Sequence, residues 1–181
     1  MMATLASSFV QLAEECEREG LTLKNAEKIG HELAQFFGVK QDEVGILRLE
    51  HKNLVFCYPA KLHDVGSIPL NTSTSVAVRA ANTHRGEVIN NFAQVKHTSI
   101  FEAVDLGADR TSHLVGDEKP DQHVHVIQKL MAAPVMAAEG ALGVIEISRK
   151  GVSAPVSGPD FTTVDLQKLV ACASALAKCF K

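Results

Sequence analysis

The chain has 181 residues, 46% of them hydrophobic, and its 18 basic and 21 acidic residues give a formal net charge of −3. Such a length and composition are those of one globular domain, so we expect a single domain over residues 1–181. No apolar run approaches the roughly 18 residues that cross a bilayer, and no signal peptide is recognisable, which predicts a cytoplasmic protein without a membrane partner. Because the chain has no tryptophan, one tyrosine and no basic block, nucleic acid is not expected as a partner either.

Two amphipathic helices are predicted at the start of the chain. The first covers residues 3–19 and ends before Gly20. Its apolar side chains recur every three or four residues, at Leu5, Phe9, Leu12 and Cys16. The second helix is capped by Thr22 at its N-terminus and stops at Gly38. We expect the domain core to begin near residue 20, with the first helix preceding it.

A hairpin, a helix and a further strand are predicted next. Alternating apolar residues over 44–50 and 53–60 indicate two antiparallel strands joined by a short polar turn. The small polar residues 71–75 can cap a helix over residues 76–83, and residues 88–92 return as a strand. Helices and strands therefore both contribute to the domain.

The longest irregular region of the sequence lies between residues 93 and 121. It is mostly polar, and only residues 100–106 form a run long enough for a helix. Long irregular connections are uncommon inside compact domains unless they cover or form a binding site. We therefore expect this region to be a lid or a binding loop.

The last third of the chain predicts a hairpin and a helix. Residues 130–137 and 142–148 are two apolar runs, and Gly140 supplies the turn between them. In the second run alternate residues fall on opposite faces, which is the period of a half-buried strand. Apolar residues at helical spacing then run from residue 166 to the end of the sequence. The order of elements predicts an α+β fold around a mostly antiparallel sheet.

Residues 129–150 resemble the late strand pair of GAF domains, with an apolar-Pro-apolar strand, a short turn and a Leu-Gly-Val-Ile strand. Residues 68–70 with the helix after them, and residues 86–91, resemble the middle of these domains, so the likeness covers roughly residues 20–181. The resemblance implies a central five- or six-stranded sheet. The terminal helices would lie on one face, and a pocket covered by a helix and loops on the other.

A second part of the resemblance follows the hairpin. Many GAF domains carry an Asn-Lys pair there, and then a phenylalanine and two acidic residues in the next helix. Here Lys150, Phe161 and Asp165 match, whereas Arg149 replaces the asparagine and Leu166 the second acid. Because the match is incomplete, we expect Lys150 and Asp165 to form a structural salt bridge rather than the cyclic-nucleotide signature known in some of these domains.

The resemblance also implies a non-covalent small-molecule site beneath the middle helix, without a cofactor. The residues whose positions could reach such a site are Tyr58, Ser75, Arg79, Asn91, Phe92, His97, Thr98, Ser99 and Phe101. A guanidinium at Arg79 facing the sheet would favour an anionic ligand, whereas pairing with Glu87 would leave it at the surface. Aromatic residues are few, which disfavours haem or a bilin as the ligand.

No catalytic motif is recognisable, and we expect the protein not to be an enzyme. Some GAF relatives reduce free methionine sulfoxide through cysteines on the loops over the pocket, and others attach a bilin to a pocket cysteine. The cysteines of this chain are Cys16, Cys57, Cys172 and Cys179. None falls between residues 71 and 128, so methionine sulfoxide reductase activity is a disfavoured alternative.

The sharpest chemical cluster is the histidine pair His123 and His125. In an extended strand the two imidazoles would lie roughly 6.5–7 Å apart on one face and could share a metal with His113 or Asp121. Because nothing fixes a third ligand at an informative spacing, we favour a solvent-exposed pair and expect no metal.

Together these observations predict a sensory or regulatory domain that binds an unknown small molecule and acts as a homodimer in signalling or transcriptional control. The dimer would form through the terminal helices, where Cys172, Ala175 and Cys179 make a second stripe. A separate signalling partner would carry the output. The alternative is a ligand-free dimerisation or protein-interaction module, whose pocket would be filled by its own phenylalanine and leucine side chains.

Overall fold

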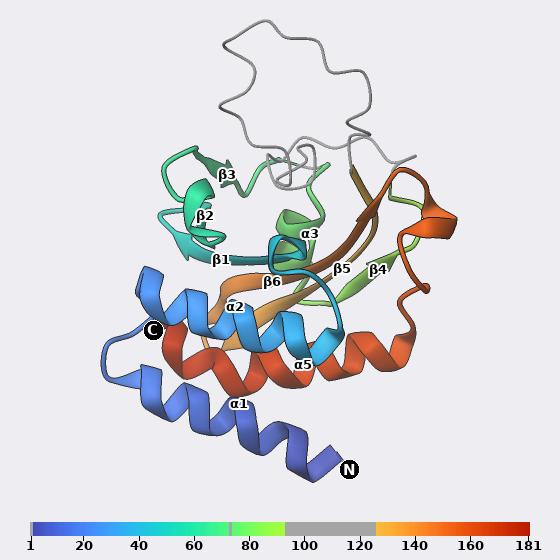
Figure 1. Ribbon diagram of the computed structural model, residues 1–181. Coiled ribbons are helices and arrows are strands. Elements are labelled where there is room, and N and C mark those ends of the chain that lie inside the picture. The colour runs from blue at the N-terminus through green and yellow to red at the C-terminus, as the bar shows by residue number, and fades with distance from the viewer. Residues whose placement is uncertain (1, 73, 93–125) are drawn as a thin grey trace, which may run out of the picture.

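The structure is a computed structural model that describes residues 2–72, 74–92 and 126–181 (Figure 1). The strands in these ranges are β1 Val44–Glu50, β2 Asn53–Tyr58, β3 Ser67–Pro69, β4 Glu87–Ile89, β5 Val126–Ala137 and β6 Gly140–Gly151. The α-helices are α1 Met2–Glu17, α2 Leu23–Phe37, α3 Val76–Thr83 and α5 Thr163–Leu176. Short 3₁₀ helices are η1 Gln41–Glu43, η2 Ala60–Leu62, η5 Ala154–Val156 and η6 Ala177–Phe180. The α+β class predicted from the sequence is confirmed.

All strand pairs are antiparallel, and the six-stranded sheet has the order β3-β2-β1-β6-β5-β4. The two hairpins predicted from alternation, β1–β2 and β5–β6, are both present. β1 joins them by pairing with β6, from Val44 opposite Ile147 to Arg48 opposite Gly143. β3 is an edge strand that the sequence did not predict, since it has three residues, including Pro69, and is too short to show alternation.

β4 forms the opposite edge of the sheet and pairs with only part of β5. It covers Leu130–Ala132 of the longer strand. β5 continues past this contact to Ala137 and there pairs, among the described strands, with β6 alone. Pro134 lies in this continuation, where a residue without an amide hydrogen is tolerated.

The sheet separates two apolar cores. α1, α2 and α5 lie on one side of it, and α3 lies on the other (Figure 1). In β6, Ile145 and Ile147 belong to the core beneath α2 and α5, whereas Val144 belongs to the core beneath α3. We call these the helix side and the α3 side of the sheet. The predicted separation of the terminal helices from the middle helix is therefore confirmed.

Helices begin and end where the sequence offers capping residues. Thr22 Oγ1 accepts a hydrogen bond from the Asn25 amide at 3.2 Å, and Gly38 ends α2 in the left-handed region with φ of 62°. Ser75 caps α3 by accepting a hydrogen bond from the Val78 amide at 3.4 Å. Such N-caps contribute about 1 kcal/mol each.

α1 packs over the other helices of the helix side. The rings of Phe9 and Phe36 meet edge to face with their centroids 5.6 Å apart. The thiol of Cys179 lies 3.6 Å from the carbonyl oxygen of Ala13. Cys172 and Cys179 are both buried in this core. These cysteines, which the sequence assigned to a stripe facing a second copy of the chain, are therefore covered within one chain.

Candidate functional site

Buried polar side chains gather on the α3 side of the central strand β6. Glu146, Ser148 and Lys150 follow Val144 at every second position, so they share its side of the sheet. Glu146 and Ser148 are fully buried, and Lys150 is 6% exposed. Charged side chains are seldom buried in this way, because removing them from water is costly. We therefore take Glu146, Ser148 and Lys150, the polar row of β6, as the candidate site.

Glu146 stands between two small residues of the neighbouring strands. Its cross-strand partners are Gly45 of β1 and Ala132 of β5. Neither of these cross-strand neighbours places a large side chain directly beside the carboxylate. An ionised carboxylate accepts hydrogen bonds and donates none. The middle of the polar row thus combines an acceptor group with low side-chain volume.

The C-terminal end of the polar row is fixed by η1. Ser148 Oγ donates a hydrogen bond to the Glu43 carbonyl at 3.0 Å, and the Lys150 amide donates to Glu43 Oε1 at 2.6 Å. The ammonium of Lys150 lies 3.3 Å from Asp42 Oδ2. Through these contacts the segment after α2 is tied to β6, and the buried cation has an acidic partner.

The predicted salt bridge between Lys150 and Asp165 is wrong. Asp165 instead completes a capping box at the start of α5, where its Oδ2 accepts hydrogen bonds from the amide and the hydroxyl of Thr162 at 2.8 Å each. Burial alone would raise the pKa of Asp165, but these hydrogen bonds, with the charges of Lys168 and Arg149, hold the pKa below its usual value. Lys150 faces the α3 side, across the sheet from α5.

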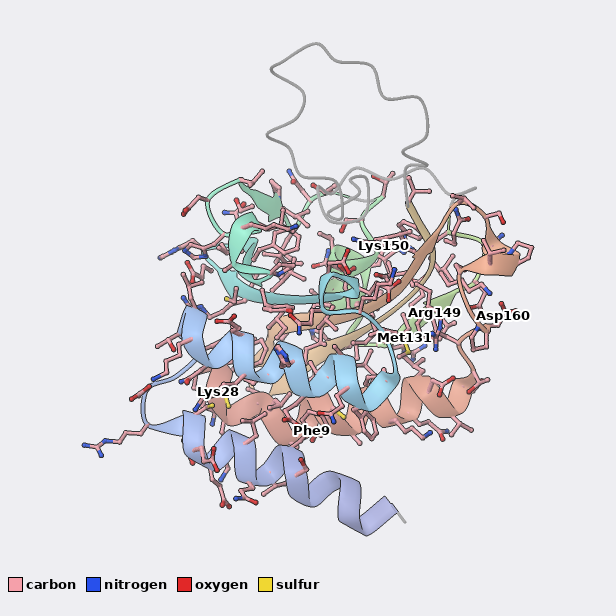
Figure 2. All side chains as sticks on the ribbon, viewed as in Figure 1. Phe9, Lys28, Met131, Arg149, Lys150 and Asp160 are labelled. Atoms are coloured by element: carbon pink, nitrogen blue, oxygen red, sulfur yellow. The ribbon has the colours of Figure 1, made fainter. Side chains whose placement is uncertain are left out.

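Arg149, rather than Lys150, is the residue at the end of β6 that faces α5. Neighbouring residues of a strand point to opposite faces, so Arg149 faces the helix side. Its guanidinium carbon lies 4.9 Å from the ring centre of Phe161, a distance at which a cation and an aromatic face attract. Nearby, the buried ammonium of Lys129 lies 2.7 Å from Asp160 Oδ1. Figure 2 shows Arg149 and Asp160 at the same edge of the molecule, where these contacts hold the connection between β6 and α5.

Ser75 and Phe92 lie on the α3 side, where the sequence analysis placed them. Ser75 is the N-cap of α3, and Phe92 is 1% exposed within the α3-side core. Asn91, beside Phe92, is exposed. Other side chains that fill this core are Leu47, Leu54, Phe56, Val76, Leu130 and Val144. The layer under α3 is therefore mainly apolar, and the polar row is its exception.

Arg79 is already paired. Its Nε and Nη2 donate hydrogen bonds to the two carboxylate oxygens of Glu87 at 3.1 and 3.0 Å. The two side chains are 34% and 36% exposed. This is the surface pairing that the sequence analysis kept as its alternative, so Arg79 presents no free positive charge to an anionic ligand.

Tyr58 lies on the helix side, and its assignment to the ligand site is wrong. In the pairing of β1 with β2, Leu47 lies opposite Phe56 and Ile46 lies opposite Tyr58. Cys57 therefore has no partner on β1 and is the extra residue of a β-bulge. The bulge turns Tyr58 to the side opposite Phe56. There the ring packs so closely on α2 that a Cβ added to Gly30 would lie 2.7 Å from it.

The four cysteines have the character of core residues. All are buried, and all belong to the helix-side core, across the sheet from the polar row. Burial raises the pKa of Cys172 to about 12 and that of Cys179 to about 11. Burial also raises the pKa of Cys16 and of Cys57. Because the thiolate is the reactive form, these thiols are poor nucleophiles near neutral pH.

Several predicted features lie outside the described residues. They are the helix over 100–106, the ligand residues His97, Thr98, Ser99 and Phe101, and the metal candidates His113, Asp121, His123 and His125. Within the described ranges, no group of three or more histidine, cysteine, aspartate or glutamate side chains could hold a metal ion. No helix in those ranges is both long and apolar enough to cross a bilayer.

Sequence reasoning missed the polar row as a site. The alternation of β6 put Glu146 and Ser148 on one face but gave no sign that this face is buried. A signal was available, because β6 follows a nearly continuous apolar run in β5, and such a pair of strands is typical of a sheet covered on both faces. A charged residue in such a strand, here Glu146, is therefore a candidate site residue.

The arrangement of sheet and helices is that of a GAF domain, as the resemblance implied. The structure is similar to the GAF domain of a phosphoenolpyruvate-protein phosphotransferase from Acinetobacter, with a TM-score of 0.61 and 12% identity over 97% of this chain and 92% of that one. It is also similar to the GAF domain of nlh2 from A. aeolicus in an inactive state, with a TM-score of 0.55 and 15% identity over 99% and 98% of the two chains.

A further similar structure is the free methionine-R-sulfoxide reductase from Neisseria meningitidis in complex with its substrate, with a TM-score of 0.60 and 16% identity over 99% of this chain and 90% of that one. The sequence itself matches no family model and no curated protein. At these identities the likeness establishes the fold. Because the same fold occurs in a phosphotransferase domain and in a reductase, the function must be argued from the site.

Proposed function

We propose that this chain is a regulatory domain of the GAF type that binds a small polar molecule against the polar row of β6. The observation that carries the proposal is the complete burial of Glu146 and Ser148 on the side of the sheet that α3 covers. Apolar residues of similar volume stabilise a core at least as well as buried charges do. Charged groups kept at such a position therefore support a binding role.

The chemistry of the polar row favours a ligand with hydrogen-bond donors or a positive charge. An ionised Glu146 carboxylate only accepts hydrogen bonds. Lys150 is engaged in an ion pair, and Ser148 donates to a backbone carbonyl, so the row as a whole is not a cationic surface. The anionic ligand expected from Arg79 has less support, because Glu87 neutralises that guanidinium.

Binding rather than catalysis is proposed because the thiols lie on the wrong side of the sheet for this site. All four cysteines are in the helix-side core, and their pKa values are raised by burial. A reductase that works through a pocket thiolate needs a cysteine that is both accessible and acidic. The similarity to the Neisseria reductase is therefore explained by a shared fold.

We further propose that the protein acts as a homodimer and passes its signal to a separate partner. The outward faces of α1 and α5 are the surfaces concerned, and their exposed apolar residues include Val10 and Val170, at 41% and 43% exposure. The buried Cys172 and Cys179 take no part in this surface. Measurement of the molar mass in solution, with Val170→Glu as the disrupting variant, tests the dimer.

A ligand-free interaction module is the second candidate, and one observation favours it. The side chains under α3 are closely packed, and Phe56 and Phe92 are each 1% exposed. Such filling is what the sequence analysis expected of a domain without a ligand. The two candidates differ in whether a molecule binds next to Glu146.

Native mass spectrometry of the full chain distinguishes the two candidates. The protein is incubated with the small-molecule extract of its expression host and weighed under native and denaturing conditions. We expect the wild-type protein to carry an adduct that leaves on denaturation. Glu146→Gln, which removes the charge and keeps the shape of the side chain, should not bind this molecule. Glu139→Gln at the exposed β5–β6 turn is the matched control and should keep the adduct. An adduct that survives in E146Q contradicts the Glu146 site, and a wild-type protein without any adduct favours the interaction module.

A further inference from the structure

Residues 88–92, which form the end of the edge strand β4 and the segment after it, contact both cores of the domain. Val88 packs on the helix-side core and Ile89 on the α3-side core, as alternation along a strand requires. The side chain of Asn90 then binds the backbone that leads into α5. Phe92 returns to the α3-side core, where it is 1% exposed. Residues 88–92 therefore connect the two sides of the sheet within a few positions.

Asn90 holds Phe161 through both of its backbone groups. The Phe161 amide donates a hydrogen bond to Asn90 Oδ1 at 2.9 Å, and Asn90 Nδ2 donates to the Phe161 carbonyl at 3.0 Å. The two residues are 71 positions apart in the sequence, so the contact is a tertiary link. Thr162, the N-cap of α5, follows directly. Asn90 thus fixes the backbone from which α5 begins.

Phe92 is well placed to sense packing on the α3 side. Protein interiors contain few voids, so a buried ring shifts only together with its backbone or its neighbours. Asn91 alone separates Phe92 from Asn90, and two steps of chain span at most roughly 7 Å. A displacement of the Phe92 backbone is therefore passed to Asn90 over a very short connection.

We infer that Asn90 is a positioning residue that couples the packing of Phe92 on the α3 side to the first turns of α5 on the helix side. A change of packing at Phe92 moves Asn90, weakens its hold on Phe161 and loosens the start of α5. Because α1 packs against α5, the change reaches the outermost helix of the domain. The coupling belongs to the fold and goes beyond the proposed ligand, since any event that repacks Phe92 would engage it.

Hydrogen exchange of the full chain, read by mass spectrometry, tests the coupling. The reporter is the set of amides at residues 166–169, where the helix begins its regular hydrogen bonds with Leu166 N to Thr162 O at 3.1 Å. Asn90→Ala removes both hydrogen bonds to Phe161 and should speed exchange of these amides about tenfold. Phe92→Leu, which keeps an apolar side chain but removes ring volume, should speed exchange of the same amides about threefold or more.

The double variant and a matched control decide the result. In N90A/F92L, exchange at residues 166–169 should equal that of N90A alone, because the link is already cut. Leu54→Ala is the control, since Leu54 is fully buried in the same core but lies on β2, which β1, β6 and β5 separate from β4 in the sheet. It should lower overall stability without a selective change in α5.

Two outcomes would overturn the inference. In the first, F92L loosens the α3 side while residues 166–169 exchange as in the wild type. In the second, N90A and F92L have additive effects in the double variant, which would show that they act independently. If N90A does not fold, Asn90→Asp keeps the acceptor for the Phe161 amide and loses the donor, and it allows the same comparison with a smaller expected change.

Discussion

Gly30→Ala opposes two effects of known size at the contact between α2 and the sheet. Alanine is a better helix former than glycine by about 1 kcal/mol, so helix propensity alone predicts a more stable protein. The added methyl group, however, would lie 2.7–2.8 Å from three atoms of the Tyr58 ring. Tyr58 is 7% exposed and packed within the helix-side core, so its ring has little room to turn away.

We expect the steric effect to win. Overpacking of a core costs about 1–3 kcal/mol, and after the helix gain of about 1 kcal/mol a net loss of up to about 2 kcal/mol in the free energy of unfolding remains. Urea denaturation followed by circular dichroism should show a lower midpoint with an unchanged slope. In a Tyr58→Leu background, which removes the outer ring atoms, Gly30→Ala should become neutral or stabilising. The reasoning is refuted if Gly30→Ala stabilises the wild type, or if its effect is the same in both backgrounds.

Three further predictions concern other contacts. Gly143→Ala should destabilise the protein by about 3 kcal/mol or more in urea denaturation, because the new Cβ would overlap the backbone carbonyl of Leu47, which cannot rotate away as a side chain can. A loss of stability no larger than that of Gly30→Ala would contradict this steric argument. Asp165→Asn should lower stability at neutral pH, and the difference from the wild type should shrink as the pH falls below about 3.9, because a carboxyl whose pKa is lowered in the folded state stabilises above its unfolded pKa and loses that contribution as the pH falls through the folded value. A difference that stays constant into acid would exclude the charge as its cause. A maleimide should leave all four cysteines of the native protein essentially unlabelled and label all four in denaturant, since all are buried and burial raises the pKa of each thiol, that of Cys172 to about 12. Fast labelling of one thiol in the native protein would support the reductase alternative.

Sequence reasoning succeeded where one residue type determines the local backbone. Thr22 and Gly38 were identified as helix caps from their chemistry, and the small polar run 71–75 as the source of a cap for the next helix; in the structure Thr22, Gly38 and Ser75 have these roles. The two hairpins were recognisable because alternation continues for several residues on both strands. β3 was missed because a three-residue edge strand shows no period.

Side assignments failed where strand pairing decides which way a residue points. Counting in twos from Phe56 places Tyr58 on the α3 side, but the bulge at Cys57 reverses it, and no feature of the sequence marks that bulge. The error at Lys150 was avoidable, since the alternation of β6, continued by one step, separates Lys150 from α5. Asn90 could not have been found, because its partner lies 71 residues away and the contact is to backbone atoms.

The unequal lengths of β4 and β5 bear on how the protein behaves at high concentration. A strand that outruns its neighbour presents an edge to which another chain can add, and fibrils grow by repeated additions of this kind. Among the described strands, the stretch of β5 beyond Ala132 pairs with β6 alone, but Ala133, Pro134 and Val135 are buried, so an incoming chain could pair with them only after displacing what covers them. This burial limits growth of the sheet from one molecule to the next, a protection that concerns solubility and is independent of any ligand.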